Sequence, residues 1–367
     1  MSIFRAIPVA FGATAALAML AGCAGGNSTA ALSPSAPAAG GQSVQRQLAS
    51  AAPNNSLLPP SVTRRSNKPV TTATFIDADA AGKSLIFVAD AADGVIDIYA
   101  QAGKNQKSVG QITGLTEPQG ITTDKKGDLY VANTNSSNVL VYAPPYTGKP
   151  ELTITDAREF PADVAVSSTG VVAVTNICNA PSCLVSTGNV AIYAKGATKS
   201  CATVSDPVFN FAQVMFAAYD KSGGLYIDGL NSGYQTSFGL VTGGCAATGI
   251  TDLSAVYTVG FPGGIQIDMA GRIAFADPVR QQIATFDPPV NDAFGAPVTT
   301  TPLTGASSPL GFALLASGTD LYVADAGGSG LAEEYQYTAG GSAINTIAAG
   351  GQPIGVAVTP PLTKESN

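Results

Sequence analysis

The side chains of this chain that could do chemistry are carboxylates, amides and thiols, because its 367 residues include no His and no Trp. Without imidazole there is no Ser-His-Asp triad, no Cys-His pair and no side chain that ordinarily titrates near neutral pH. Most hydrolase mechanisms are therefore disfavoured from the start. A net charge of −7 and an isoelectric point near 4.6 also argue against a nucleic-acid partner, whose phosphates require a basic surface.

Acidic and amide side chains recur at one position of a repeated pattern, namely at Asp90, Asn133, Asn176, Asp277 and Asp325. Such oxygens are suitable ligands for Ca²⁺ at the mouth of a channel. Alternatively, each side chain caps its own hairpin through an Asx turn. The recurrence favours capping, because a functional site is normally asymmetric.

One acidic residue breaks this symmetry and is therefore the better binding candidate. Asp163 stands where the other repeats have Gly120, Gly264, Gly311 and Gly355. If a cation is bound, the weak calcium candidates are Asp163, Asn133 and Asp277.

Four cysteines follow Cys23, and an even number in an exported chain indicates two disulfides with three possible pairings. We expect Cys178 to pair with Cys183 inside one enlarged hairpin. We expect Cys201 to pair with Cys245, because both fall in predicted outermost strands of neighbouring repeats. A zinc-thiolate site is the competing interpretation, and the pair spacing does not favour it.

The elements that must position these residues are short strands, since 41 Gly and 24 Pro disfavour long helices. The template runs from Pro118 to Asn133: a turn, an alternating strand, a Gly turn and a second strand. Its closing residues lie at 90, 133, 176, 229, 277 and 325, about 47 residues apart, which is a propeller period. A third strand ending in an aromatic residue and a looser fourth strand follow. The pattern predicts an all-β, six-bladed propeller of four-stranded blades over residues 73–361.

The carboxyl-terminal segment Pro353–Thr359 has the phase of a first strand with no second strand after it. The simplest closure places this segment in the incomplete first blade, ahead of residues 85–89. The alternative uses residues 73–77 as that first strand and sends the terminal strand elsewhere.

The amino terminus is predicted to be a targeting segment. An apolar run ends in Leu20-Ala21-Gly22-Cys23, which resembles a bacterial lipobox. The resemblance implies that residues 1–22 are a lipoprotein signal peptide and that Cys23 is lipidated, with outer-membrane anchoring. Residues 23–72 are predicted to be a disordered Ala/Ser/Pro/Gly linker, and residues 362–367 a tail.

The pattern Pro-x-Gly-Ile-x-x-Asp-x-x-Gly-x-Leu-Tyr-Val-Ala-Asn at residues 118–133, followed by a strand ending in Val141-Tyr142, resembles NHL-repeat propellers. The folded part is similar to exported bacterial propellers. Such folds include lyases, lactonases and binding modules. The lyases need His, which is missing. Lactonases of the gluconolactonase type bind their metal through Glu, Asn and Asp. We expect no Glu in the innermost strands, because all the candidate residues lie outside the segments predicted for these strands: Glu117, Glu151, Glu159, Glu333 and Glu334.

These observations predict a lipid-anchored, non-catalytic binding module of the cell envelope that is monomeric and needs no cofactor. Its partner is the membrane, through the lipid, together with an envelope protein or a glycan. The alternative function is a Ca²⁺-dependent lactonase or hydrolase.

Overall fold

The computed structural model describes residues 73–80, 82–101, 103–104, 106–179, 187–206, 210–327 and 330–360. The predicted signal peptide, Cys23, the linker and the tail lie outside these residues. The described part is all-β, with three short 3₁₀ turns besides its strands. It holds no helix with the length and apolarity needed to cross a bilayer.

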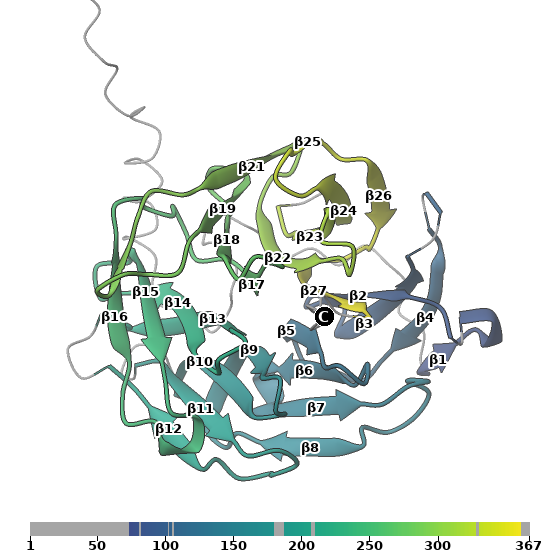
Figure 1. Ribbon diagram of the computed structural model, residues 1–367. Coiled ribbons are helices and arrows are strands. Elements are labelled where there is room, and N and C mark those ends of the chain that lie inside the picture. Colours follow the sequence, from purple (N-terminus) through teal and green to yellow (C-terminus); the bar gives the residue numbers. More distant parts are fainter. Residues whose placement is uncertain are drawn as a thin grey trace, which may run out of the picture. The chain divides into compact units, whose positions relative to one another are not determined.

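Six sheets of mainly antiparallel strands surround a central axis as the blades of a propeller (Figure 1). From the axis outward, blade 1 contains β27 (Pro353–Thr359), β2 (Leu85–Asp90), β3 (Val95–Ala100), β4 (Ser108–Ile112) and β1 (Phe75–Ile76). Blade 2 contains β5 (Pro118–Thr123), β6 (Leu129–Asn133), β7 (Asn138–Tyr142) and β8 (Leu152–Thr155). Blade 3 contains β9 (Glu159–Val166), β10 (Val172–Asn179), β11 (Asn189–Tyr193) and β12 (Ala202–Val204).

Blades 4 to 6 follow the same order from the axis outward. Blade 4 contains β13 (Gln213–Tyr219), β14 (Leu225–Leu230), β15 (Thr236–Val241), β16 (Thr251–Ala255) and β20 (Ala293–Phe294). Blade 5 contains β17 (Ile265–Ile267), β18 (Ile273–Asp277), β19 (Gln282–Phe286), β21 (Thr299–Thr304) and β25 (Gly341–Ser342). Blade 6 contains β22 (Pro309–Leu314), β23 (Asp320–Asp325), β24 (Leu331–Gln336) and β26 (Asn345–Ala348). The 3₁₀ turns are η1 (Ala78–Ala80), η2 (Thr134–Ser136) and η3 (Gly244–Ala246).

The prediction of six four-stranded blades is confirmed, with one addition. Blades 1, 4 and 5 each carry a fifth strand of two residues at the outer edge: β1, β20 and β25. The strands β20 and β25 pair in parallel with β16 and β21. These short strands cover part of the edges that would otherwise expose unpaired backbone groups.

The ring is closed by the carboxyl-terminal strand. β27 pairs with β2 from Leu85↔Thr359 to Asp90↔Pro353 and also contacts β5 and β22. Contacts between innermost strands then run from β5 through β9, β13 and β17 to β22. The alternative closure is wrong, because β1 pairs with β4 at the periphery instead of lying beside the axis (Figure 1).

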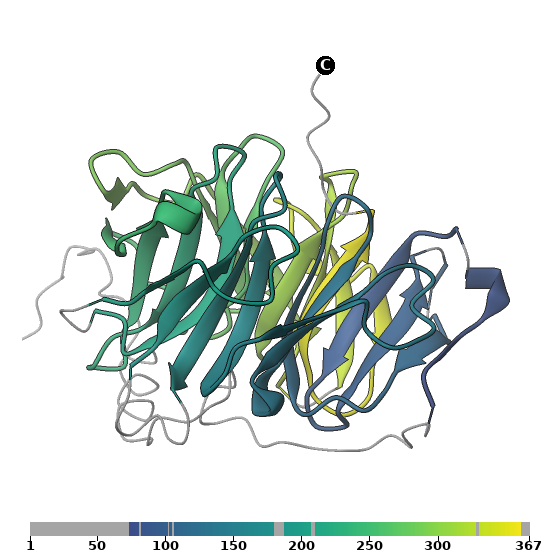
Figure 2. The same cartoon turned by 90° about the horizontal axis from the view of Figure 1, so that it is seen from below.

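The hydrophobic core consists of apolar layers between neighbouring blades, which stand face to face in the side view (Figure 2). Val139 and Ile154 of blade 2, for example, belong to one buried cluster with Val174 and Ala191 of blade 3. Alternate residues of a strand point to opposite faces of its sheet, so each blade contributes to two such layers. Burying one Val, Leu or Ile side chain contributes about 1.5–3 kcal/mol, and these layers therefore fix the blades in place.

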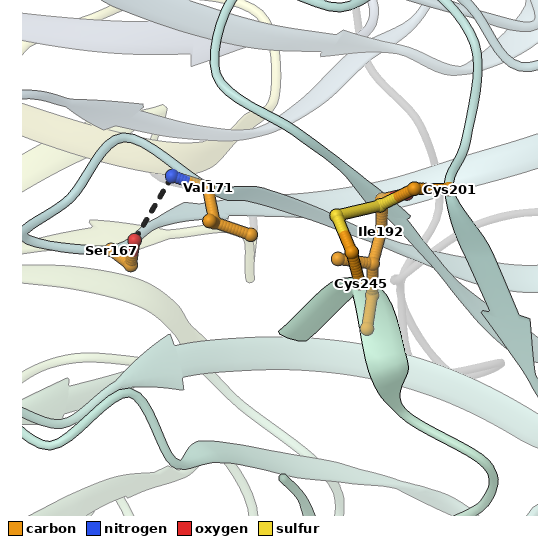
Figure 3. Close-up of a disulfide and its surroundings, with 5 residues drawn as sticks. All are labelled: Ser167, Val171, Ile192, Cys201 and Cys245. Atoms are coloured by element: carbon orange, nitrogen blue, oxygen red, sulfur yellow. Dashed lines mark hydrogen bonds between the residues drawn. A yellow bond between two sulfur atoms is a disulfide. The ribbon is translucent and has the colours of Figure 1, made fainter. Parts of the chain in front are cut away.

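One disulfide links blades 3 and 4. Cys201 and Cys245 are bonded with a Cα–Cα distance of 5.2 Å, beside Ile192 (Figure 3). The pairing agrees with the prediction, but neither residue lies in an outermost strand: Cys201 directly precedes β12 and Cys245 belongs to η3. Cys178 is buried at the end of β10, and its predicted partner Cys183 lies outside the described residues.

Candidate functional site

The repeated Asp and Asn positions lie at one end of the ring. Because neighbouring strands are antiparallel, the innermost strand of a blade begins at the end where the second strand finishes. We call this end the entry face and the other end the exit face. The loop that enters each blade therefore lies beside the turn between its second and third strands.

Asp90 and Asp325 show what the repeated position does. Oδ1 of Asp90 accepts hydrogen bonds from the backbone N–H groups of Asp93, at 3.1 Å, and Gln352, at 2.9 Å. Asp325 accepts a hydrogen bond from the N–H of Ser308 at 2.6 Å and another from the N–H of Gly327, in its own turn, at 3.2 Å. Each carboxylate thus caps its hairpin and also holds the loop that leads into the innermost strand.

The same position carries related contacts in blades 2, 3 and 5. Asn133 accepts the N–H of Thr116 at 2.6 Å. Asn176 donates to the Asn189 side chain at 3.0 Å. Asp277 forms an ion pair of 2.8 Å with Arg280. It also accepts hydrogen bonds from the backbone N–H of Gly260, in the loop that enters the blade, and from that of Arg280 in its own turn.

The three calcium candidates do not share a site in this structure. Asn133 and Asp277 are engaged as described above, and Asp163 accepts the N–H of Ala217 at 3.1 Å. In the described part of the chain, no three Asp, Glu or Cys side chains are grouped so that they could hold a metal ion.

Apolar side chains occupy most of the equivalent positions around the axis near the entry face, whereas blade 2 has the buried polar residue Gln119 there. Ala162, Met215, Leu310 and Ile354 occupy equivalent positions in blades 3, 4, 6 and 1, and all are fully buried in one apolar cluster. Since their strands surround the axis, these side chains meet across it.

Asp163 occupies space that its neighbour leaves empty. A Cβ on Gly120 of blade 2 would collide with the Asp163 carboxylate, so the acidic residue depends on glycine beside it. The side chain is 8% exposed, and its bond to Ala217 ties blade 3 to blade 4. Burial raises the pKa of Asp163 to about 7.

A second buried carboxylate near Asp163 is missing from the sequence-based candidates. Asp228 of β14 accepts the N–H groups of Phe216 and Gly263, both at 3.1 Å, and so joins blades 4 and 5. Burial raises its pKa well above the usual range, and the Asp163 charge adds to this shift. The available signal was an Asp at a position where most other repeats have Ala, such as Ala132, Ala276 and Ala324, and blade 3 has Thr175.

These buried carboxylates predict that the protein is more stable in mild acid than in mild base. The folded-state pKa values of Asp163, about 7, and Asp90, about 6, lie above the usual values. Protonation therefore favours the folded state, and its stabilising effect is lost as the pH rises through 6–7. We expect Tm at pH 8 to be lower than at pH 5 by about 2 °C or more. Asp163→Asn should reduce this difference in a thermal scan, and an equal slope in the variant would refute the assignment.

The entry face of blades 2 and 3 carries three non-glycine residues with left-handed backbone, one of which, Ser137, occupies a turn position that is also left-handed at Gln281 of blade 5. Glu117, Ser137 and Arg158 are left-handed, with φ of +60°, +52° and +68°. Each such residue costs about 1–3 kcal/mol, and residues of this kind cluster at ligand sites. We call Glu117, Asn135, Ser137, Arg158 and Glu159 the blade 2–3 patch. Ser137 Oγ donates to the Glu159 carbonyl at 2.8 Å, which connects the two blades.

The Glu117 carboxylate is buried at the base of this patch. It accepts hydrogen bonds from the amides of Asn135 and Gln119. Asn135 is exposed, and so is Arg158 at the start of blade 3. The patch therefore combines a fixed carboxylate with accessible polar groups.

The expectation that no Glu lies in an innermost strand is wrong for Glu159, which begins β9. The repeat template started at Pro161, so two residues of the strand were missed. Glu159 accepts the side-chain amides of Asn179 and Asn189, both at 3.1 Å. Its pKa is raised to about 7, mainly by burial and further by Asp156. Both oxygens are engaged with amides, so its position alone does not restore the lactonase metal set.

The fold and the repeat define the class of protein. Residues 115–142 match the NHL repeat family model, and the chain is a six-bladed β-propeller that contains this repeat. No curated protein sequence is significantly similar to it.

Solved structures with this fold are similar in shape and distant in sequence. A chain of a nidogen/laminin complex has a TM-score of 0.58 at 15% identity, covering 76% of this chain and 100% of that one. A protein of unknown function from Bacteroides caccae has a TM-score of 0.54 at 12% identity, covering 76% and 99%. A functionally unknown protein from Desulfotomaculum acetoxidans has a TM-score of 0.52 at 13% identity, with the same coverage. At these identities the likeness concerns the fold.

Proposed function

We propose that the protein is a non-catalytic binding module whose recognition surface is the blade 2–3 patch. The observation that carries the proposal is the set of left-handed residues at Glu117, Ser137 and Arg158, held over two carboxylates with fixed amide partners. Strained backbone persists where the surrounding structure maintains it, and binding sites are a frequent reason. Exposed Asn135 and Arg158 would contact a polar partner, either an envelope protein or a glycan.

A reaction at the axis has less support. Met215, Leu310 and Ile354 form an apolar layer around the axis near the entry face. The repeated carboxylates there are occupied with backbone N–H groups. A rigid scaffold carrying polar loops fits recognition better, since loops on such scaffolds commonly provide the binding contacts.

The recognition surface can be tested by photo-crosslinking in cells. A photoreactive amino acid at Ser136, beside the patch, should give a discrete adduct with the partner. The same amino acid at Ser222, an exposed turn residue on the exit face of blade 4, should give none. Adding Arg158→Ala and Asn135→Ala should reduce the adduct at Ser136 about tenfold, the equivalent of about 1.4 kcal/mol. Equal adducts at both positions, or no loss in the double variant, would contradict the proposal.

We also propose that the module is anchored in the outer membrane through a lipid on Cys23. The support is the lipobox sequence alone, and the linker of residues 23–72 would then hold the propeller away from the head groups. Cys23→Ser should move most of the protein from the membrane fraction to the soluble fraction. Cys245→Ser, which leaves the lipobox intact, serves as the matched cysteine control. Membrane retention of Cys23→Ser would refute lipid anchoring.

A further inference from the structure

A pocket of about 550 Å³ lies on the exit face between blades 1 and 2. One wall is the segment that contains β1 and η1, another is the start of β2 with the end of β27, and the third consists of two turns of blade 2. The volume falls within the range of about 300–1,000 Å³ typical of small-molecule sites. The pocket lies at the other end of the ring from the blade 2–3 patch, so its function is independent of that proposal.

The pocket has apolar walls. Ile76, Leu85, Pro144, Pro145 and Tyr146 line it, together with Pro360. Most of its accessible surface is thus presented by aliphatic and ring carbons, and this favours a ligand with an apolar body.

Hydrogen bonds and ring packing hold these walls in place without a ligand. The Tyr146 hydroxyl donates to the Gly127 carbonyl at 2.7 Å, and the ring packs edge-on against Phe87 at 4.9 Å. Gln101 donates to the carbonyls of Leu85 and Thr359, at 3.1 and 2.8 Å. A preformed site binds its ligand without first having to order its walls.

The rim of the pocket is basic, although the chain as a whole is acidic. Lys83, Lys125 and Lys126 all line it and are exposed. In the described residues none of the three forms an ion pair. The acidic groups nearby are Asp77, which lines the same pocket, and Asp124 with Asp128, which belong to the turn of Lys126.

Lys126 is partly neutralised, because it interacts electrostatically with Asp128. Among the residues that line the pocket, three Lys side chains stand against one Asp, so the lining carries an excess of positive charge to which Lys83 and Lys125 contribute. An ammonium group at the edge of an apolar cavity attracts an anionic head group, and the attraction is stronger where water is partly excluded.

We propose that this pocket binds a small anionic amphiphile, one molecule at a time, with its apolar body between the Pro144–Tyr146 turn and Leu85 and its anionic group at Lys83 and Lys125. The class includes aliphatic and aromatic carboxylates. Neither a neutral apolar molecule nor a bare inorganic anion would use both halves of the site.

Titration calorimetry on the full chain tests the proposal with sodium decanoate as the probe. We expect one decanoate per chain, bound at least about tenfold more tightly than decanol, decyltrimethylammonium or inorganic phosphate. The affinity should fall with added salt, because exposed charges are screened. Decanol or phosphate binding as tightly as decanoate would overturn the proposal, since one half of the site would then be unused.

Variants locate the site. Lys83→Gln with Lys125→Gln should weaken decanoate about tenfold and leave decanol unchanged. Lys221→Gln is the matched control, because Lys221 occupies the same turn position in blade 4 as Lys125 does in blade 2. Thr147→Trp fills the pocket from an exposed position and should abolish decanoate binding with little change in Tm. Undiminished binding in the Thr147→Trp chain would place the amphiphile elsewhere and refute the proposal.

Discussion

A chain that ends at Gln352 is expected not to fold. Such a chain lacks β27, whose Ile354, Val356 and Val358 are at most 3% exposed. Burial of three such side chains contributes about 5–9 kcal/mol, which is comparable to the whole stability of about 5–15 kcal/mol of a typical protein. The truncation would also leave β2 with an unpaired edge beside the axis. Circular dichroism and a thermal scan should show no cooperative transition.

The matched control is a chain that ends at Pro360. It keeps β27 whole and removes residues 361–367, which lie outside the described residues. Its Tm should stay within about 2 °C of the full chain, an effect of less than about 1 kcal/mol. If the chain ending at Gln352 melted cooperatively near the same temperature, closure by β27 would not be what stabilises the ring.

The second large effect is expected from Asp325→Ala. This carboxylate is 1% exposed and accepts hydrogen bonds from the N–H groups of Ser307, Ser308 and Gly327 and from the Ser307 hydroxyl. Removing it leaves several backbone donors without their acceptor, at a cost of about 3–5 kcal/mol. For a domain of this size we expect a Tm decrease of at least about 6 °C, measured by differential scanning calorimetry. Asp325→Asn keeps one acceptor oxygen, so its Tm should lie between the Tm of the unmodified chain and that of Asp325→Ala.

Asp320 provides the control in the same strand. It is half-exposed at the other end of β23, and its carboxylate accepts the hydroxyl of Thr319. Asp320→Ala should change the free energy of unfolding by less than about 0.5 kcal/mol.

Ca²⁺ added to chelator-treated protein should leave Tm unchanged if the repeated carboxylates act as caps. A calcium-dependent Tm increase that Asp325→Ala abolishes would instead support the cation interpretation.

The repeat was readable from the sequence because it depends on local chemistry. The Pro-x-Gly turn, the alternating strands and the closing Asp or Asn recur in most blades, so the strands of blade 2 were predicted close to their observed bounds. The phase of Pro353–Thr359 likewise predicted a first strand without a second one. The unpaired edge of β2 decided between the two possible closures, since only an innermost strand could cover it beside the axis.

The local pattern misled where a blade departs from the template. The strand β9 begins at Glu159, two residues before the template's Pro161, and pairs through two register shifts. That irregularity brought a carboxylate into an innermost strand where none was expected. The left-handed backbone of Glu117 and Arg158 likewise has no sequence signal, because neither residue type favours that conformation.

The sequence by itself determined the number of blades, their order and the position at which Asp163 breaks the repeat, because each follows from periodicity and turn chemistry along the chain. Only the tertiary structure decided what that break means: the Asp163 carboxylate fills the space beside Gly120 and binds a backbone N–H that is 54 residues away. The exit-face pocket was likewise invisible in the sequence, since its walls come from both ends of the folded chain and from blade 2. Contacts between residues so distant in sequence depend on how the ring closes, and no local pattern encodes them.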